Sequence, residues 1–130
     1  MTLDSKKDET RFCWLDLASS STRKAEEFYA YMFGWQAQHN RVNGGEYTCF
    51  VGGGEAIASL YQLAPRQLAA GVPSHWTPYV SVHDVDEMAS RARSNGGQVV
   101  VSPFSFDGVA RVSLIVDPTG ALIGLWERWK

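Results

Sequence analysis

The sequence repeats one pattern twice, and this repeat constrains the fold more than any other feature. In each copy an apolar strand precedes a helix that ends at glycine. The distance from Trp14 to Gly34 equals the distance from Thr77 to Gly97, 20 positions in each case. Further strand-like runs follow each helix. Two βαβββ units in one register therefore predict a duplicated α+β domain.

Hydrophobic periodicity and turn residues place the elements of each copy. In the first copy, apolar residues recur at helical spacing over 25–32, after serines that can cap the helix, and Gly34 ends it. In the second copy, Asp84 caps the helix and the residues 95–97 end it. Residues 64–74 are predicted to be a connecting loop. The predicted strands are 11–17, 35–42, 46–51 and 55–63, then 75–82, 98–101, 110–116 and 121–126.

The strongest turn signal is Asp117-Pro118-Thr119-Gly120, near the C-terminus. Proline fixes its own φ and disfavours helix at the residue before it, and Gly120 accepts the positive φ that closes a tight reversal. β-branched residues precede this turn and an apolar run follows it, so we expect a hairpin. Residues 52–54, all glycine, are the looser counterpart in the first copy.

Composition excludes several classes of protein. The chain has 130 residues, 45% of them hydrophobic and 20% charged, which fits one globular domain. A formal charge of −2, a pI near 5.9 and the absence of any basic run argue against a nucleic-acid partner. No run of 18 apolar residues and no leader pattern is present, so we expect no membrane partner and a cytoplasmic location.

Domain boundaries and cysteine roles follow from the same pattern. Residues 1–10 are polar and predicted to be a disordered tail, so that one domain spans 11–130 with modules at about 11–63 and 75–128. Cys13 and Cys49 fall in predicted strands, where buried, reduced thiols are expected.

An ordered set of short motifs resembles the vicinal oxygen chelate superfamily, which comprises glyoxalases, bleomycin resistance proteins and extradiol dioxygenases. The resemblance covers about residues 11–128 and implies paired βαβββ modules that curve into a cup around a small-molecule site, with the helices outside. The motifs are Trp14-Leu15-Asp16-Leu17, Phe28-Tyr29, Phe33-Gly34-Trp35, Trp76-Thr77-Pro78-Tyr79-Val80-Ser81-Val82, Asp84-Val85-Asp86 and Asp117-Pro118-Thr119-Gly120-Ala121.

The resemblance also implies where a metal ion would bind. Metal-dependent members place His, Glu or Gln at one cup-facing position on the first and last strand of each module. Those positions here are predicted to hold Trp14, roughly Ala58, Thr77 and Gly124. None offers a strong donor for a divalent ion. We therefore expect no cofactor, with a divalent metal as the alternative.

Candidate ligand-binding residues come from the strand faces predicted to lie opposite the helices. Aromatic side chains would form flat walls, and a few polar groups would orient a ligand. Arg111 is the partner expected for Asp16 by charge, and the pair could serve either the architecture or ligand capture. The aromatic residues could equally be packed core. The candidates are Trp14, Asp16, Thr77, Tyr79, Arg111 and Trp126.

Three classes of function compete. The favoured one is a glyoxalase-like or bleomycin-resistance-like protein that binds a small, partly aromatic molecule in its cup without metal. The first alternative is a lyase, isomerase or dioxygenase-type enzyme with a non-standard site, in which Asp16 or Tyr79 acts as acid or base. The second is a non-catalytic dimerisation module. We also expect a homodimer, because members with two modules commonly pair and Trp129 offers an aromatic surface near the terminus.

Overall fold

The computed structural model describes residues 10–42, 45–106 and 108–128. It contains two βαβββ modules, joined by a short helix. The elements are β1 (Phe12–Ser19), α2 (Thr22–Phe33), β2 (Gln36–Val42), β3 (Gly45–Gly52), β4 (Glu55–Gln62), α3 (Pro65–Ala69), β5 (His75–Ser81), α4 (Val85–Ser94), β6 (Gln98–Phe106), β7 (Ala110–Val116) and β8 (Leu122–Arg128). Residues 1–9 of the predicted tail and the predicted turn at 43–44 lie outside the described residues.

The strands form a mixed sheet whose hydrogen-bonded order is β2-β3-β4-β1-β5-β8-β7-β6. β1 pairs with β4, and β5 with β8, in parallel, while β2–β3–β4 and β6–β7–β8 are antiparallel meanders. The predicted α+β class and the paired modules are therefore confirmed. The described residues divide into two compact units: an N-terminal unit within 15–77, and a C-terminal unit, which joins residues within 78–128 to residues 10–14.

The two main helices begin at equivalent positions. The Ser21 side chain accepts a hydrogen bond from Lys24 N at the start of α2, and the Asp84 side chain accepts one from Glu87 N at the start of α4. The caps are 63 positions apart (84 − 21), as are Trp14 and Thr77 (77 − 14). Each cap satisfies a backbone N–H that the helix leaves unpaired. The matched caps support the predicted repeat.

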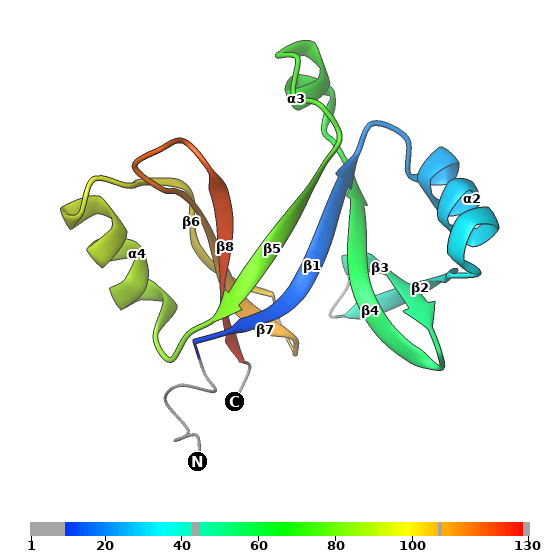
Figure 1. Cartoon of the computed structure of the whole chain (residues 1–130), viewed down its shortest axis with the longest axis horizontal. Helices are drawn as coiled ribbons and strands as arrows, with labels where there is room; N and C mark the ends of the chain where they lie inside the picture. Colours follow the sequence, from blue (N-terminus) through cyan, green and yellow to red (C-terminus); the bar gives the residue numbers. More distant parts are fainter. Residues whose placement is uncertain (1–9, 43–44, 107, 129–130) are drawn as a thin grey trace. The chain divides into compact units, whose positions relative to one another are not determined.

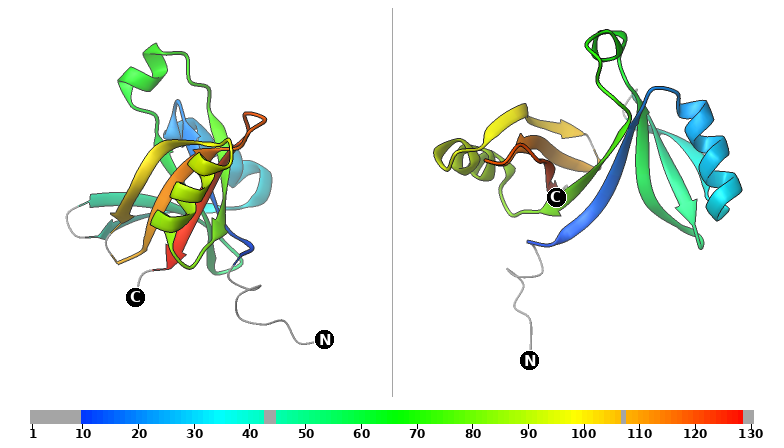
Figure 2. Two further views of the ribbon diagram at one scale, coloured as in Figure 1. Left: turned by 90° about the vertical axis from the view of Figure 1, so that its left-hand side faces the viewer. Right: turned by 45° about the horizontal axis from the view of Figure 1, so that its top comes forward.

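In the N-terminal unit, α2 lies beside the strands that it covers (Figures 1 and 2). The aromatic residues Tyr29 and Trp35 pack on the buried core, and Trp76 Nε1 donates a hydrogen bond of 3.1 Å to the Tyr29 hydroxyl. Burying each large apolar side chain contributes about 1.5–3 kcal/mol. The buried core residues are Leu17, Phe50, Ala58 and Leu60.

In the C-terminal unit, α4 packs against β6, β7 and β8. Its buried residues Val85 and Ala89 meet Val82 and Leu125, and partly buried apolar residues such as Ile115 complete the cluster. The helix is therefore held by one apolar stripe, as its spacing predicts.

The predicted hairpin at Asp117 is confirmed. Asp117 N donates to Ala121 O at 2.8 Å, and Gly120 takes a φ of 98°. The Asp117 carboxylate accepts hydrogen bonds from Thr119 N, Thr119 Oγ1 and Ala121 N. These bonds, with the Thr119 side chain as the largest cause, lower the pKa of Asp117. The side chain therefore holds the turn that joins β7 to β8.

Three local predictions are wrong. Residues 65–69 of the predicted loop form α3, because Pro65 suits the first turn of a helix and Gln67 Oε1 accepts a hydrogen bond from Ala64 N. β6 extends to Phe106, well beyond the predicted end at 101. Cys49 is buried, but Cys13 is exposed.

Across the described residues, no helix combines the length and apolar character that crossing a bilayer requires.

Candidate functional site

An aromatic face lies on the strands of the C-terminal unit, on the side opposite α4. It consists of Trp14 from β1, Tyr79 from β5 and Trp126 from β8. The ring centroids of Trp14 and Trp126 are 6.0 Å apart with the planes tilted by 38°, and Tyr79 meets Trp126 edge-on at 5.8 Å. Tyr79 is buried, whereas both tryptophans are partly exposed. The two flat indole rings thus pack against a buried cluster that includes Tyr79.

Gly124 is the residue that makes room for Tyr79. The two residues are direct neighbours in the parallel β5–β8 pair. A Cβ atom added to Gly124 would overlap the Tyr79 ring, with even Tyr79 Cγ only 2.7 Å away. The ring therefore lies in the space that a side chain at position 124 would need. Any larger residue there must displace Tyr79.

The four positions at which the resemblance implies metal ligands do not fit a divalent ion. Ala58 was assigned incorrectly: it lies in the core that packs on α2, and the residue of β4 that pairs with Asp16 on the opposite face is Ser59. The corrected positions are Trp14, Ser59, Thr77 and Gly124. A divalent ion with open positions for substrate needs about three good donors, and hydroxyl, indole and glycine do not supply them.

A polar row crosses the N-terminal unit on the face opposite α2. The pairings Asp16↔Ser59, Cys49↔Ser59 and Gln38↔Cys49 place one residue from each of β1, β4, β3 and β2 side by side. Ser59 Oγ donates a hydrogen bond of 2.8 Å to Asp16 Oδ1. We call Asp16, Ser59, Cys49 and Gln38 the polar row.

Burial raises the pKa of several acidic groups in and beside the polar row. For Asp16, burial is the largest cause and raises the pKa, while the Ser59 hydrogen bond and the nearby His75 lower it. Burial also raises the pKa of Cys49 and of Tyr61, and the Asp16 charge adds to both shifts. Desolvation disfavours the charged form of each acid. Asp16 is therefore easier to protonate than an ordinary aspartate.

Arg111 does not belong with these residues. In the β7–β8 pair it lies opposite Glu127, whereas Val112 lies opposite Trp126, so the side chains of Arg111 and Trp126 point to opposite faces. Its guanidinium binds both carboxylate oxygens of Asp86 on α4, each at 2.8 Å. The expected Asp16–Arg111 pair is replaced by Asp16–Ser59 and Arg111–Asp86. The role suggested for Arg111 is thereby corrected to one at the helix-packed face.

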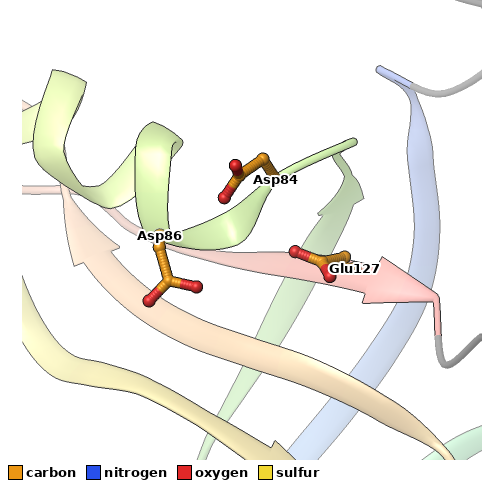
Figure 3. A group of neighbouring side chains, drawn as sticks. All are labelled: Asp84, Asp86 and Glu127. Atoms are coloured by element: carbon orange, nitrogen blue, oxygen red, sulfur yellow. The ribbon is translucent and has the colours of Figure 1, made fainter.

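Three carboxylates gather around the start of α4 (Figure 3), and their potential ligand atoms lie within 4.8 Å of one another. Asp84 caps Glu87 N, and Glu127 Oε1 accepts a hydrogen bond of 2.8 Å from Val85 N. Asp86 is paired with Arg111. Each carboxylate thus already serves the helix terminus or an ion pair. The cluster has a structural explanation.

Thr77 is buried in the N-terminal unit, with an exposed fraction of 4%. It lies between Trp76, which packs toward α2, and Pro78. The sequence reasoning missed Ser59 and the dependence of Tyr79 on Gly124. A glycine within an otherwise apolar strand was the available signal for the second, since such a glycine often marks a close approach.

Comparison with known proteins gives consistent results. Residues 11–125 match the model of the Glyoxalase/Bleomycin resistance protein/Dioxygenase superfamily. The chain is 37% identical over 116 residues to CFP32 of Mycobacterium tuberculosis, whose name assigns it provisionally to the glyoxylases. It is 30% identical over 126 residues to the anthracycline biosynthesis protein DauV of a Streptomyces species. Each alignment covers 88% of this chain, but only 44% and 46% of the respective relative, so the chain spans about half the length of these relatives.

A solved structure has the same fold. A variant of methylmalonyl-CoA epimerase from Streptomyces coelicolor, in complex with 2-nitronate-propionyl-CoA, superposes with a TM-score of 0.63 at 22% identity. The match covers 93% of this chain and 99% of the epimerase chain. At this identity the likeness concerns the fold alone.

Proposed function

Because the chain belongs to the glyoxalase/bleomycin resistance protein/dioxygenase superfamily, we propose that it binds a small, partly aromatic molecule. We propose that it does so without a metal ion at the four positions where metal-dependent members hold their ligands. The aromatic face of the C-terminal unit is the main contact surface. The cup that the resemblance implies would draw on both units and stays a prediction.

One observation carries the proposal: the Tyr79 ring lies over Gly124, beside Trp126. At that place a metal-dependent relative would need a side chain that reaches a metal ion. This chain has a flat ring there instead, and Trp14 and Trp126 extend the aromatic surface. Stacking and burial of apolar area favour a planar ligand at such a surface.

One of the similar proteins supports this ligand class. The name of DauV connects it with anthracyclines, which are fused-ring aromatic molecules with hydroxyl groups. A ligand of that kind offers more flat area for stacking on the two indole rings than a short aliphatic acid does.

Calorimetric titration with 1-methoxynaphthalene tests the proposal, because this probe has a fused aromatic ring and no hydrogen-bond donor. We expect saturable binding that weakens about tenfold in Trp126→Leu, because a flat ring is lost while apolar volume is kept. Tyr31→Ala is the matched control, since Tyr31 is 88% exposed on α2. Equal affinity of Trp126→Leu and the unmodified protein, or no binding by either, would contradict the proposal.

Metal content provides the second test. Protein purified without a histidine tag and analysed by plasma emission is expected to contain far less than one divalent ion per chain. One equivalent of zinc, nickel, iron or manganese would overturn the metal-free proposal. It would instead favour a lyase, isomerase or dioxygenase-type reaction.

A metal-free enzyme is the second candidate, and the Asp16–Ser59 pair is the observation that favours it. A carboxyl group with a raised pKa and a fixed orientation can act as general acid or base. Tyr79 is the other candidate acid. If the unmodified protein converts a bound molecule to a product and Asp16→Asn does not, the chain is an enzyme rather than a binding protein.

We further propose that the chain is a homodimer. Trp129, which suggested this, lies outside the described residues. Support now comes from the exposed apolar side chains Phe28, Tyr31, Met32 and Phe33 on α2, which a second copy could cover. The curated relatives are also long enough to hold a second domain of this size. Light scattering should give twice the chain mass of 14.4 kDa, and Met32→Lys should lower it. A mass of 14.4 kDa for the unmodified protein would contradict the dimer.

A further inference from the structure

The polar row of the N-terminal unit offers a second recognition element, independent of the aromatic face. We infer that Asp16 is its acceptor: with Oδ1 held by Ser59, Oδ2 accepts a hydrogen bond from a hydroxyl or N–H group of a small molecule, such as a phenol or an amide.

The sheet register fixes where this carboxyl points. Leu17, the next residue along β1, is buried in the core that packs on α2, so Asp16 points to the opposite face. Ser59 is its direct neighbour on β4 and donates the 2.8 Å hydrogen bond to Oδ1. A short bond between neighbouring strands orients the carboxyl group and leaves its second oxygen directed elsewhere.

That second oxygen is available to a ligand. Among the described residues, Ser59 is the one side chain that donates a hydrogen bond to Asp16, and no ion pair reaches it. No fully buried side-chain oxygen or nitrogen in the described parts of the chain lacks a hydrogen-bond partner. The unpaired Oδ2 therefore lies where solvent, or a ligand donor, can reach it. Water can complete the hydrogen bonding of this oxygen in the free protein, and a ligand donor can take the place of that water.

The surrounding charges select the kind of ligand. The titratable groups that interact with the Asp16 charge are Cys49 on β3, Tyr61 on β4 and His75 on β5. Tyr47 on β3 interacts with Cys49, and Gln38 on β2 is neutral. None of these is a lysine or arginine, so the Asp16 carboxylate has no permanent counter-ion in this set. A neutral or cationic donor is favoured here, and an anionic ligand is repelled.

Phenol and its methyl ether, anisole, form the probe pair, because they differ in one donor hydroxyl. In protein labelled with carbon-13 at aspartate, phenol is expected to shift the Asp16 carboxyl signal saturably. Because the new bond stabilises the ionised form, the pH midpoint of that signal should fall by about half a unit or more. Anisole should leave both quantities unchanged. Ser59→Ala, which removes the other donor, should raise the midpoint of the free protein.

Two further variants separate recognition from structure. Asp16→Asn keeps an oxygen for the Ser59 hydroxyl but cannot ionise, and phenol binding, followed through the Ser59 amide signal, should weaken about tenfold. Asp86→Asn is the matched control and should bind phenol as the unmodified protein does. An Asp16 signal unaffected by phenol, or moved equally by anisole, would overturn the inference. The phenol experiments test Asp16 alone. The proposal for the aromatic face is tested independently, by the titration with 1-methoxynaphthalene.

Discussion

At equivalent backbone positions, the two units carry side chains of opposite polarity. In the N-terminal unit, the row across β1, β4, β3 and β2 is Asp16, Ser59, Cys49 and Gln38. In the C-terminal unit, the corresponding row across β5, β8, β7 and β6 is Tyr79, Gly124, Leu114 and Val101. One row is polar and the other is apolar.

The helix-facing sides differ far less. Leu17, Leu60 and Phe50 under α2 correspond to Val80, Leu125 and Ile115 under α4, and all six are apolar. The need to bury each helix constrains that side in both units. The other side is free of that demand, so its residues could diverge. This difference is the reason why we propose the binding sites on the face opposite the helices.

The largest expected effect concerns the shared, helix-facing side. Phe50 is fully buried, so Phe50→Ala should lower the free energy of unfolding by about 3–5 kcal/mol through lost burial and a cavity. Ile115→Val in the other unit should cost only about 0.5–1.5 kcal/mol. Urea unfolding followed by circular dichroism measures both. A loss below about 1 kcal/mol for Phe50→Ala would show that this side is not the common core.

The next effect tests the glycine that sets the two rows apart. Gly124→Ala should cost about 1–3 kcal/mol, because the new methyl group meets the Tyr79 ring. Tyr79→Leu should recover part of that loss when the two changes are combined. A double-mutant cycle on urea unfolding gives the coupling. Additive effects would mean that the ring does not depend on the glycine.

The ionised Asp16 in the polar row should lower the free energy of unfolding. Its pKa is raised in the folded protein, so protonation favours the fold, and this contribution is lost as pH rises through the folded-state pKa. Asp16→Asn should therefore raise the free energy of unfolding by about 0.5–2 kcal/mol at pH 7. The gain should shrink on acidification. Thermal melts at several pH values provide the measurement, and a gain that grows toward acid would contradict the argument.

The smallest effect belongs to Arg111. Its bond to Asp86 lowers the pKa of that carboxyl, so the pair's contribution is present at neutral pH and is lost as pH falls through the lowered value. Because both groups are solvated, Arg111→Gln should change the melting temperature little, and less still in high salt. Affinity for 1-methoxynaphthalene should not change. A tenfold loss of affinity would return Arg111 to the binding site.

The sequence predicted the fold through features that act locally. The cap expected among residues 19–22, the cap at Asp84, the Gly34 terminus and the Asp117 turn each depend on neighbouring backbone. Each is confirmed, and the first cap is Ser21. The family assignment from ordered motifs is also confirmed.

The errors arose where local pattern was silent or misleading. Residues 56–58 are all apolar, so alternation could not show which of them faces α2, and the parallel pairing with β1 decided it. In β7, the polar residues Arg111 and Ser113 alternate with apolar ones, which suggests a solvated face. They point instead to the side that α4 covers, where Arg111 donates to Asp86 of that helix. Ser113 Oγ donates to the backbone carbonyl of Val101 on the neighbouring strand β6. The pattern of residues within one strand does not indicate hydrogen-bond partners that are distant in the sequence.

The tilt between Trp14 and Trp126 has an optical consequence. Two indoles with centroids 6.0 Å apart and planes inclined at 38° lie close enough for their excited states to couple. When the transition dipoles of such a pair are skewed, the coupling produces an exciton couplet in the circular dichroism spectrum, whose sign and size follow the mutual orientation of the rings. The circular dichroism of the Trp14–Trp126 pair should therefore change when a ligand binds between or against the two rings.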